Sequence, residues 1–91
     1  MTYQDLSSPQ LIIEHTGQVF PLGADLVTIG RSDDNVIVLA DPAVSAHHAR
    51  LAWDARRGLY TIEDLGSVEG TYINERYIGG PVRLQHGDVI R

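Results

Sequence analysis

Short runs of β-branched and aromatic residues recur along this chain, and turns rich in Gly, Pro, Asp and Asn separate them. The runs follow one another at roughly 8 to 12 residues, a spacing typical of all-β sandwiches. No segment repeats its apolar residues with the period of an amphipathic helix. The pattern therefore predicts an all-β, two-sheet β-sandwich of short antiparallel strands.

The expected strands cover residues 11–15, 19–22, 26–29, 36–39, 48–53, 59–65 and 71–74, with short apolar runs at 82–84 and 89–91. The first two strands form a hairpin around a Gly-containing turn. Residues 1–10 show no periodicity, so we expect a flexible N-terminal tail before a single domain over residues 11–91. Large aromatic residues dominate the cores of small β domains, and we expect Phe20, Trp53 and Tyr60 in this core.

The charge balance argues against a nucleic-acid partner. The net charge is −5, and all seven basic residues are arginines without any basic run, whereas nucleic-acid affinity rests on clustered cations. The absence of cysteine rules out a disulfide framework and suits a reducing compartment, so we expect a cytoplasmic location. We find no signal peptide and no apolar run of roughly 18 to 20 residues, and we expect no membrane partner.

Three small polar islands stand at the ends of strand-like runs: Gly30-Arg31, Ser45-Ala46-His47-His48, and Gly66-Ser67-Val68-Glu69-Gly70-Thr71. Arg31 offers a planar fork of donors that suits a phosphate or a carboxylate. A weak surface ion pair with Asp33 or Asp34 is the other interpretation of Arg31. The third island is not a P-loop, because it lacks the Gly-Lys-Ser/Thr end.

Ser45 and His48 invite a hydrolase interpretation, with a serine nucleophile and a histidine base. No Gly-x-Ser-x-Gly elbow surrounds Ser45, and no acid is placed to orient His48. We favour a structural role, in which the His48 imidazole bonds nearby backbone and fixes the loop that presents Ser45. His47 and His48 would point to opposite faces of a strand, and His86 has no third ligand nearby, so we expect no metal site and no cofactor.

The islands, taken in order, resemble the motifs of the forkhead-associated (FHA) domain over roughly residues 11–91. The matching motifs are Gly30-Arg31, Ser45-x-x-His48, Asp64-Leu65-Gly66-Ser67-x-x-Gly70-Thr71-x-x-Asn74 and Gly87-Asp88-Val89-Ile90. The resemblance implies a β-sandwich with binding loops at one end. It also implies a non-enzymatic module that recognises a threonine-phosphorylated protein or peptide in signalling, often in Ser/Thr kinase pathways.

The resemblance assigns roles to particular residues of this chain. It implies that Arg31 contacts the phosphate and that the Ser45 hydroxyl donates to it, a pairing that suits a dianion. It places Ser67, Val68 and Glu69 at the phosphopeptide. The residues that it assigns to loop support are Gly30, His48, Gly70 and Thr71.

Three positions depart from the family pattern. Glu69 stands where the family usually has an asparagine, and an ionised glutamate cannot donate and would repel phosphate if it pointed inward. Val68 lacks the hydroxyl of many relatives, and Ala46 replaces a residue that is often polar or basic. A degenerate FHA-fold scaffold that binds a partner independently of phosphate therefore stays open as an alternative.

The C-terminus carries a further expectation. The family's sandwich has one more strand after the Gly-Asp-x-Ile turn, beside the first strand, but this sequence stops at Arg91. We expect either a truncated sequence or an unfilled edge that another chain pairs, which would give a strand-exchanged homodimer.

Overall fold

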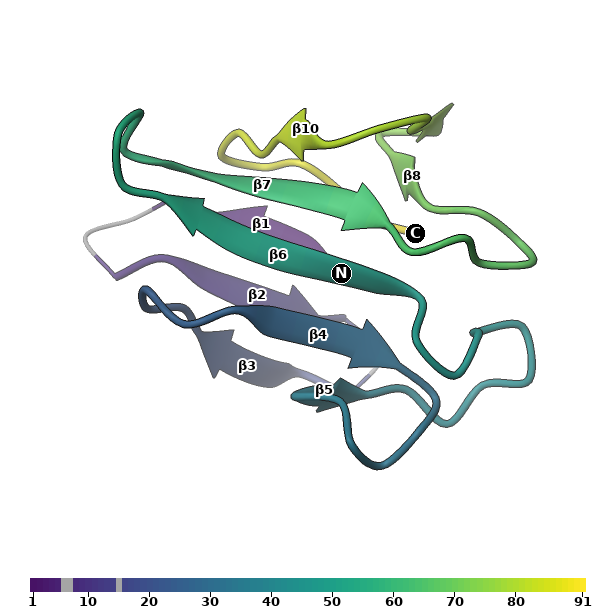
Figure 1. Ribbon diagram of the computed structural model, residues 1–91. Helices are drawn as coiled ribbons and strands as arrows, with labels where there is room; N and C mark the ends of the chain where they lie inside the picture. The colour runs from purple at the N-terminus through teal and green to yellow at the C-terminus, as the bar shows by residue number, and fades with distance from the viewer. Residues whose placement is uncertain (6–7, 15) are drawn as a thin grey trace.

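The computed structural model describes residues 1–5, 8–14 and 16–91, and within these residues the chain forms strands and turns without a helix. A three-stranded sheet has the order β1 (Thr2–Gln4), β2 (Gln10–Ile13), β3 (Gln18–Pro21). A five-stranded sheet has the order β10 (Val82–Arg83), β7 (Leu59–Asp64), β6 (Ala49–Asp54), β4 (Val27–Gly30), β5 (Ile37–Val38). Strands β8 (Tyr72–Ile73) and β9 (Arg76–Tyr77) form a separate hairpin. The predicted all-β sandwich is confirmed (Figure 1).

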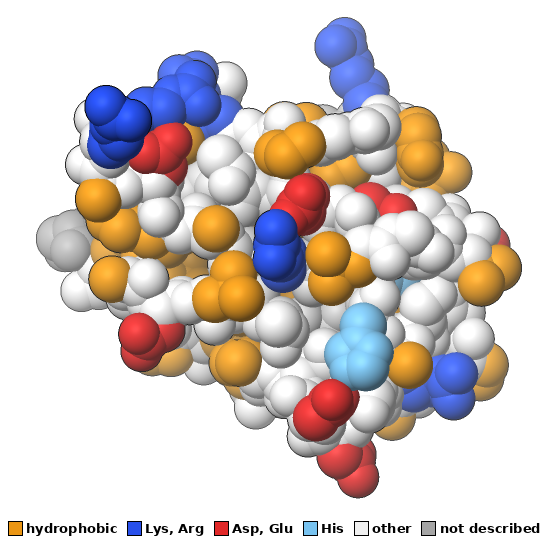
Figure 2. Space-filling model, in the orientation of Figure 1, with side chains coloured by type: hydrophobic (Ala, Val, Ile, Leu, Met, Phe, Trp, Pro, Cys, Tyr) orange, Lys and Arg blue, Asp and Glu red, His pale blue; other side chains and the backbone are white. Residues whose placement is uncertain are grey.

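The core lies between the three-stranded and the five-stranded sheet. Leu11 from one sheet and Ile62 from the other are both 0% exposed. Side chains alternate between the two faces of β6, so that Leu51 is buried and its neighbour Arg50 is exposed, as expected for a sheet with one face in solvent. On that outer face hydrophobic side chains lie in small groups between polar and charged ones (Figure 2). Burial of each large aliphatic residue contributes about 1.5–3 kcal/mol to the stability of the sandwich.

The aromatic residues expected in the core are only partly inside it. Tyr60 is buried, and its hydroxyl donates to the carbonyl of Gly23 at 2.8 Å. Phe20 packs against the core from a partly buried position. Trp53 lies opposite Tyr60 in the β6–β7 register with ring centroids 4.8 Å apart, but it keeps 38% of its surface exposed. The expectation for Trp53 is corrected, because its place near the end of β6 leaves one side of the indole in solvent.

The expectation of a flexible tail over residues 1–10 is wrong at Thr2–Gln4. This segment is β1, and Tyr3 pairs with Leu11 in the antiparallel register of β2. Tyr3 is 3% exposed and meets the ring of Tyr60 edge to face at 6.0 Å. Burial of this one aromatic side chain orders a segment that has no periodicity of its own. Leu6 and Ser7 of the expected tail lie outside the described residues, as does His15 of the first expected strand.

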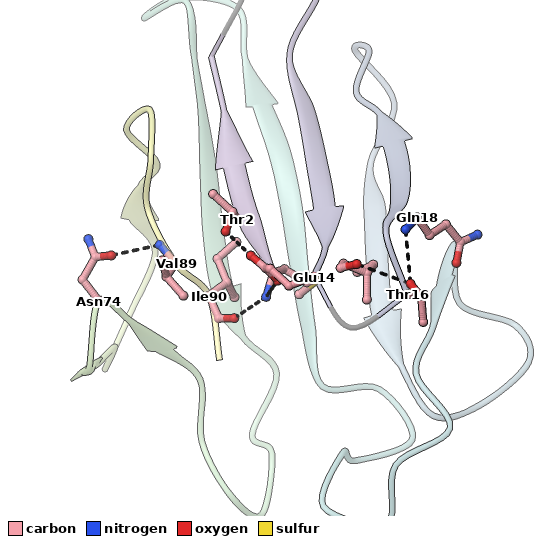
Figure 3. A network of polar contacts seen from close by, with 9 residues as sticks. Thr2, Glu14, Thr16, Gln18, Asn74, Val89 and Ile90 are labelled. Carbon is pink, nitrogen blue, oxygen red and sulfur yellow. Dashed lines mark hydrogen bonds and ion pairs between the residues drawn. The ribbon is translucent and has the colours of Figure 1, made fainter.

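Strand β1 occupies the place beside β2 that the sequence left unfilled. On its far side Thr2 bridges Val89, the N–H of Ile90 donates to the carbonyl of Met1 at 2.6 Å, and the N–H of Tyr3 donates to the carbonyl of Asp88 at 2.9 Å. The Met1 amino group also donates to Ile90, at 2.8 Å (Figure 3). The unfilled edge was the premise for a strand-exchanged homodimer, and β1 removes that premise by filling the slot from within the chain.

The pairing of β4 with β5 is parallel, which corrects the expectation of antiparallel strands at this position. The segment between them contains a turn, which the N–H of Asn35 closes on the carbonyl of Ser32 at 3.2 Å, and β5 then pairs with its Ile37 opposite Ile29. Two-residue strands satisfy the pattern of alternating residues in either direction, so the sequence left the direction of β5 open.

Candidate functional site

The sheet order brings the three polar islands to one end of the sandwich (Figure 1). Strand β6 runs antiparallel to both β4 and β7. Its beginning therefore lies beside the ends of its two neighbours. Arg31 follows β4, Ser45 lies in the loop before β6, and residues 66–70 follow β7. The convergence that the islands suggested is a direct consequence of this order.

Arg31 is held from its backbone and from its side chain. Its N–H donates to the carbonyl of Ser45 at 3.0 Å, and its Nε donates to the carbonyl of Val44 at 3.0 Å. The side chain is exposed, and the terminal nitrogens of the guanidinium have no hydrogen-bond partner among the described residues. These two contacts fix the direction of the side chain and leave its fork of donors available to a ligand.

The surface ion pair considered for Arg31 does not form with Asp34. That carboxylate faces His47 instead, with both of its oxygens 3.0 Å from Nε2. The hydrogen bond from His47, with a smaller one from Ser32, lowers the pKa of Asp34 below its ordinary value. The contact ties the loop after β4 to the loop before β6.

The Ser45 hydroxyl connects the second island to the third. Its Oγ accepts a hydrogen bond from the backbone N–H of Val68 at 3.0 Å. A hydroxyl that accepts one bond keeps its own hydrogen for a further acceptor. Ser45 therefore presents a donor close to the backbone of Arg31.

His48 braces two loops from inside. It is 9% exposed; its Nδ1 accepts from the N–H of Ser45 at 3.1 Å, and its Nε2 lies 2.8 Å from the carbonyl of Gly70. These partners assign the tautomer that carries its hydrogen on Nε2. Both ring nitrogens are bonded to backbone, so neither faces the Ser45 hydroxyl as a base. The geometry matches the structural role and gives no support to a serine hydrolase.

Asp64 holds the third loop together through hydrogen bonds, a role that the sequence did not predict. Its Oδ2 accepts from the N–H groups of Gly66 and Ser67, each at 3.0 Å, and its Oδ1 accepts from the hydroxyls of Thr71 at 2.8 Å and of Ser67. Burial opposes ionisation of Asp64, but these hydrogen bonds outweigh it and hold the pKa of the carboxyl below its ordinary value. The signal was present, because an aspartate before a glycine turn commonly bonds the following N–H groups.

The three residues expected at the phosphopeptide from this loop have different surroundings. The Ser67 hydroxyl donates to Asp64 and accepts from the N–H of Gly70 at 2.9 Å, so it is committed inside the loop. Val68 is 90% exposed, and Glu69 is also exposed. Of these three residues, Val68 and Glu69 are therefore the ones whose side chains face solvent.

Gly30 is required by a close backbone approach. A Cβ at this position would lie 2.2 Å from the carbonyl oxygen of Ala46. Asn35, which sequence reasoning also missed, donates from Nδ2 to that same oxygen at 2.7 Å and to the carbonyl of Ser32 at 2.8 Å. Asn35 is 7% exposed and joins the first loop to the second. The two loops are thus packed backbone to backbone beside Arg31.

Gly70 and Thr71 close the third loop on its inner side. Gly70 has a φ angle of 85°, in the left-handed region that favours glycine, and a Cβ at this position would lie 3.1 Å from the ring of Tyr77. Thr71 is 1% exposed, with its hydroxyl on Asp64. The loop-support role that the resemblance implies for both residues stays a prediction.

The site as a whole offers one cation, one hydroxyl donor and a rigid frame of backbone bonds. The described residues contain no group of three or more His, Cys, Asp or Glu side chains placed to hold a metal ion. The described residues contain no helix that could cross a membrane. The arrangement is suited to holding an anion by charge-assisted hydrogen bonds.

Comparison with known proteins places this arrangement in a family. The FHA domain model matches residues 27–91. The FHA domain-containing protein FhaB of Mycobacterium tuberculosis is 40% identical over 76 residues, which are 84% of this chain and 48% of FhaB. The transcriptional regulatory protein EmbR of the same species is 40% identical over 76 residues, 84% of this chain and 19% of EmbR. The chain thus spans about half or less of these curated relatives.

Solved structures agree with the sequence comparison. The structure of M. tuberculosis EmbR in complex with a low affinity phosphopeptide superposes with a TM-score of 0.81 and 38% identity, over 90% of this chain and 21% of that chain. The FhaA FHA domain complexed with the intracellular domain of Rv3910 gives a TM-score of 0.79 and 30% identity, over 90% and 87% of the two chains. The chain belongs to the FHA domain family, and the resemblance drawn from its motifs is confirmed.

Proposed function

We propose that this domain recognises a threonine-phosphorylated protein or peptide and so mediates protein–protein interaction in signalling, without catalysing a reaction. The observation that carries the proposal is the pairing of Arg31 with Ser45. The backbone N–H of Arg31 donates to the carbonyl of Ser45 at 3.0 Å, which holds the two residues side by side. The terminal nitrogens of the Arg31 guanidinium and the hydroxyl hydrogen of Ser45 remain available to a ligand. The relatives EmbR and FhaA support it, since EmbR is described in complex with a phosphopeptide and FhaA with a protein partner.

The chemistry of a phosphate monoester suits these two groups. The dianion carries three strong acceptor oxygens, and a guanidinium can bind two of them through parallel N–H bonds. The Ser45 hydroxyl supplies a further donor. Hydrogen bonds to charged groups contribute about 1.5–3 kcal/mol each, enough to make binding depend on the phosphate. We assign the phosphate to Arg31 and Ser45 and the partner's backbone and side chains to Val68 and Glu69.

Phosphate-independent scaffolding is the second candidate, and it rests on the third loop. Val68 presents an apolar side chain that is 90% exposed, next to the exposed carboxylate of Glu69. An apolar tip suits a partner surface without phosphate, and the carboxylate would weaken the attraction of a dianion. The two candidates differ in whether binding requires Arg31 and the phosphoryl group.

A titration separates the two candidates. A phosphothreonine peptide library first supplies a binding sequence, which is then synthesised with and without the phosphate. Isothermal titration of the wild type is expected to detect only the phosphorylated peptide, and Arg31→Ala is expected to abolish that binding. The control is Arg56→Ala, which removes an exposed arginine from the turn between β6 and β7, at the other end of both strands. Equal affinity for both peptides, unchanged by Arg31→Ala, would establish the scaffold instead.

The wider setting of the domain is part of the same proposal. We assign it to a Ser/Thr kinase pathway in the cytoplasm, because the ligand it is proposed to bind is the product of such a kinase. Pull-down of threonine-phosphorylated proteins from cells of the source organism, with and without phosphatase treatment, tests this assignment. Capture that is insensitive to phosphatase would contradict it.

A further inference from the structure

A hollow of about 620 Å³ lies between the edge strand β10 and the β8–β9 hairpin, which share one side of the sandwich in Figure 1. Its floor includes Ile73 and Ile78, which are 7% and 4% exposed, and its lining also includes the exposed side chains of Arg76 and Arg83. The strand order puts β10 and β5 at opposite edges of the five-stranded sheet, and Arg31 follows β4, next to β5. The hollow is therefore a surface separate from the candidate phosphate site.

The two arginines of the hollow are unusual in a chain with 12 acidic residues and seven basic ones. Arg50, Arg57 and Arg91 each form an ion pair with a nearby carboxylate. Arg76 and Arg83 form none with the described residues, although acidic side chains outnumber basic ones. Two cations that share one hollow create a local positive potential, which attracts an anionic ligand.

The carboxylate that lines the hollow is already engaged. Among the described lining residues only Asp88 carries a carboxylate. Its Oδ1 accepts from Nδ2 of Asn74 at 2.8 Å, and its Oδ2 accepts from the N–H of Gln85 at 2.7 Å. Asn74 in turn accepts from the N–H of Val89 at 2.9 Å, which fixes the same wall (Figure 3). The guanidinium groups of the two arginines therefore remain the charged donors of the hollow.

The shape of the hollow suits an extended segment of a protein chain. Arg76 belongs to β9 and Arg83 to β10, so the two cations come from different elements. Both elements are edge strands, and an edge strand leaves backbone N–H and C=O groups unpaired on its outer side. A nucleic acid fits less well, because its charge continues far beyond the hollow and the net charge of −5 repels it.

We propose that this hollow binds an acidic segment of a partner protein. Asp or Glu carboxylates of the segment pair with Arg76 and Arg83, and an aliphatic side chain of the segment packs on Ile73 and Ile78. A guanidinium binds a carboxylate through two parallel N–H bonds, which gives such pairs direction as well as charge. The inference goes beyond the proposed function and does not depend on it, because the hollow and Arg31 lie toward opposite edges of the sheet.

The probe is a display library of unphosphorylated peptides, selected on the wild-type domain. We expect the selected peptides to be rich in Asp and Glu, with an aliphatic residue between the acidic ones. A selected peptide and its counterpart with Asn and Gln in place of Asp and Glu are then compared by isothermal titration. We expect the amide counterpart to bind at least about tenfold more weakly, because hydrogen bonds between charged groups are the strong ones.

Matched arginine variants locate the contact. Arg76→Glu and Arg83→Glu are each expected to abolish binding of the acidic peptide. Arg56→Glu reverses the same charge at an exposed arginine in the β6–β7 turn, outside the hollow, and is expected to keep the affinity. The double variant Arg76→Glu/Arg83→Glu is expected to prefer a counterpart peptide with Lys in place of Asp and Glu. All three positions are exposed, so the variants are expected to fold, and amide spectra check this.

Several outcomes would overturn the inference. Selected peptides without an excess of Asp and Glu would do so, as would a loss of binding that Arg56→Glu reproduces in full. Binding that Arg31→Ala abolishes would place the acidic peptide in the candidate phosphate site instead. A single-stranded oligonucleotide that displaces the acidic peptide and needs Arg76 and Arg83 would assign the hollow to nucleic acid. Acidic-peptide binding that Arg31→Ala retains supports the inference, whether or not phosphothreonine peptides bind.

Discussion

The Ser45 hydroxyl accepts a hydrogen bond from the backbone N–H of Val68 across 3.0 Å, which links the loop before β6 to the loop after β7. The link orients the hydroxyl before any ligand arrives. Its oxygen is occupied as an acceptor, so its hydrogen is directed to an incoming acceptor such as a phosphate oxygen. The proposed binding surface is thus assembled from backbone and side-chain contacts between loops that are distant in sequence.

Replacing Ser45 with alanine removes the proposed donor and the link between the loops. We expect Ser45→Ala to weaken phosphothreonine-peptide binding about tenfold or more, because hydrogen bonds to charged groups are the strong ones. The loss of stability is expected to stay near 1 kcal/mol, since the freed Val68 N–H can reach water. Isothermal titration and chemical denaturation measure the two effects. Ser8→Ala, at an exposed serine, is the control, and an unchanged affinity of Ser45→Ala would remove Ser45 from the site.

Gly30 is expected to tolerate no side chain. In Gly30→Ala the new Cβ would meet the Ala46 carbonyl at 2.2 Å, and a backbone atom cannot rotate away. We expect a loss of about 2 kcal/mol or more, with the loops before and after it displaced. Gly23→Ala is the matched control, because a Cβ there meets nothing within 4 Å. Thermal unfolding compares the two variants, and equal melting temperatures would contradict the close approach.

Asp64 makes the stability of the domain depend on pH in the acidic range. Its hydrogen bonds lower the pKa of the folded state below the ordinary value of about 4. A carboxyl with a lowered pKa contributes its stability above the unfolded pKa, and the contribution disappears as the pH falls through the folded pKa. Asp64→Asn is therefore expected to be less stable than the wild type at neutral pH, and the difference is expected to shrink below about pH 4.

The matched control for Asp64 is Asp33→Asn, which changes an exposed aspartate whose carboxylate accepts no hydrogen bond from the described residues. Urea denaturation across the acidic range gives the free energy of unfolding of each variant. A constant difference between the wild type and Asp64→Asn from neutral pH down to pH 3 would show that the carboxylate is not the stabilising form.

Glu69 is expected to weaken phosphopeptide binding. Glu69→Asn removes a negative charge from the exposed part of the third loop and introduces an amide that both donates and accepts. We expect an affinity gain of about fivefold, the equivalent of about 1 kcal/mol for one charge pair in a wet environment. Asp25→Asn, before β4, removes the same charge away from the loops. An affinity that Glu69→Asn leaves unchanged would show that its carboxylate points away from the ligand.

Strand β1 is expected to be part of the folded core. Tyr3→Ala removes a ring that is 3% exposed and packed edge to face on Tyr60, and we expect a loss of about 3–5 kcal/mol. Gln4→Ala, on the same strand with its side chain on the other face, is expected to cost less than about 1 kcal/mol. Urea denaturation measures both. Equal small effects would mean that residues 2–4 are not docked in solution.

The local pattern of this sequence was sufficient for the fold class and for most of the loops that are proposed to bind the ligand. Alternating β-branched runs predict strands because side chains alternate between the faces of a sheet. Arg31, Ser45 and His48 could be singled out as candidates because they lie near the ends of such runs at a motif spacing. The hairpin of β8 and β9 escaped prediction: its turn places Asn74 and Glu75 at positive φ, and Asn74 lacks the following glycine that usually marks such a turn.

The sequence by itself determined a β-sandwich and the residues that are proposed to bind phosphate, because both depend on short-range order along the chain. Only the tertiary structure decided that β1 pairs with β2. It also decided that the Ser67 hydroxyl donates to Asp64 and that Asp64 holds the third loop through hydrogen bonds. These features depend on contacts between segments that are distant in sequence or on the competition of several donors for one carboxylate. An apolar groove between β3 and β5 also depends on such distant contacts, since Ile13 and Ile37, which line it, come from the two different sheets.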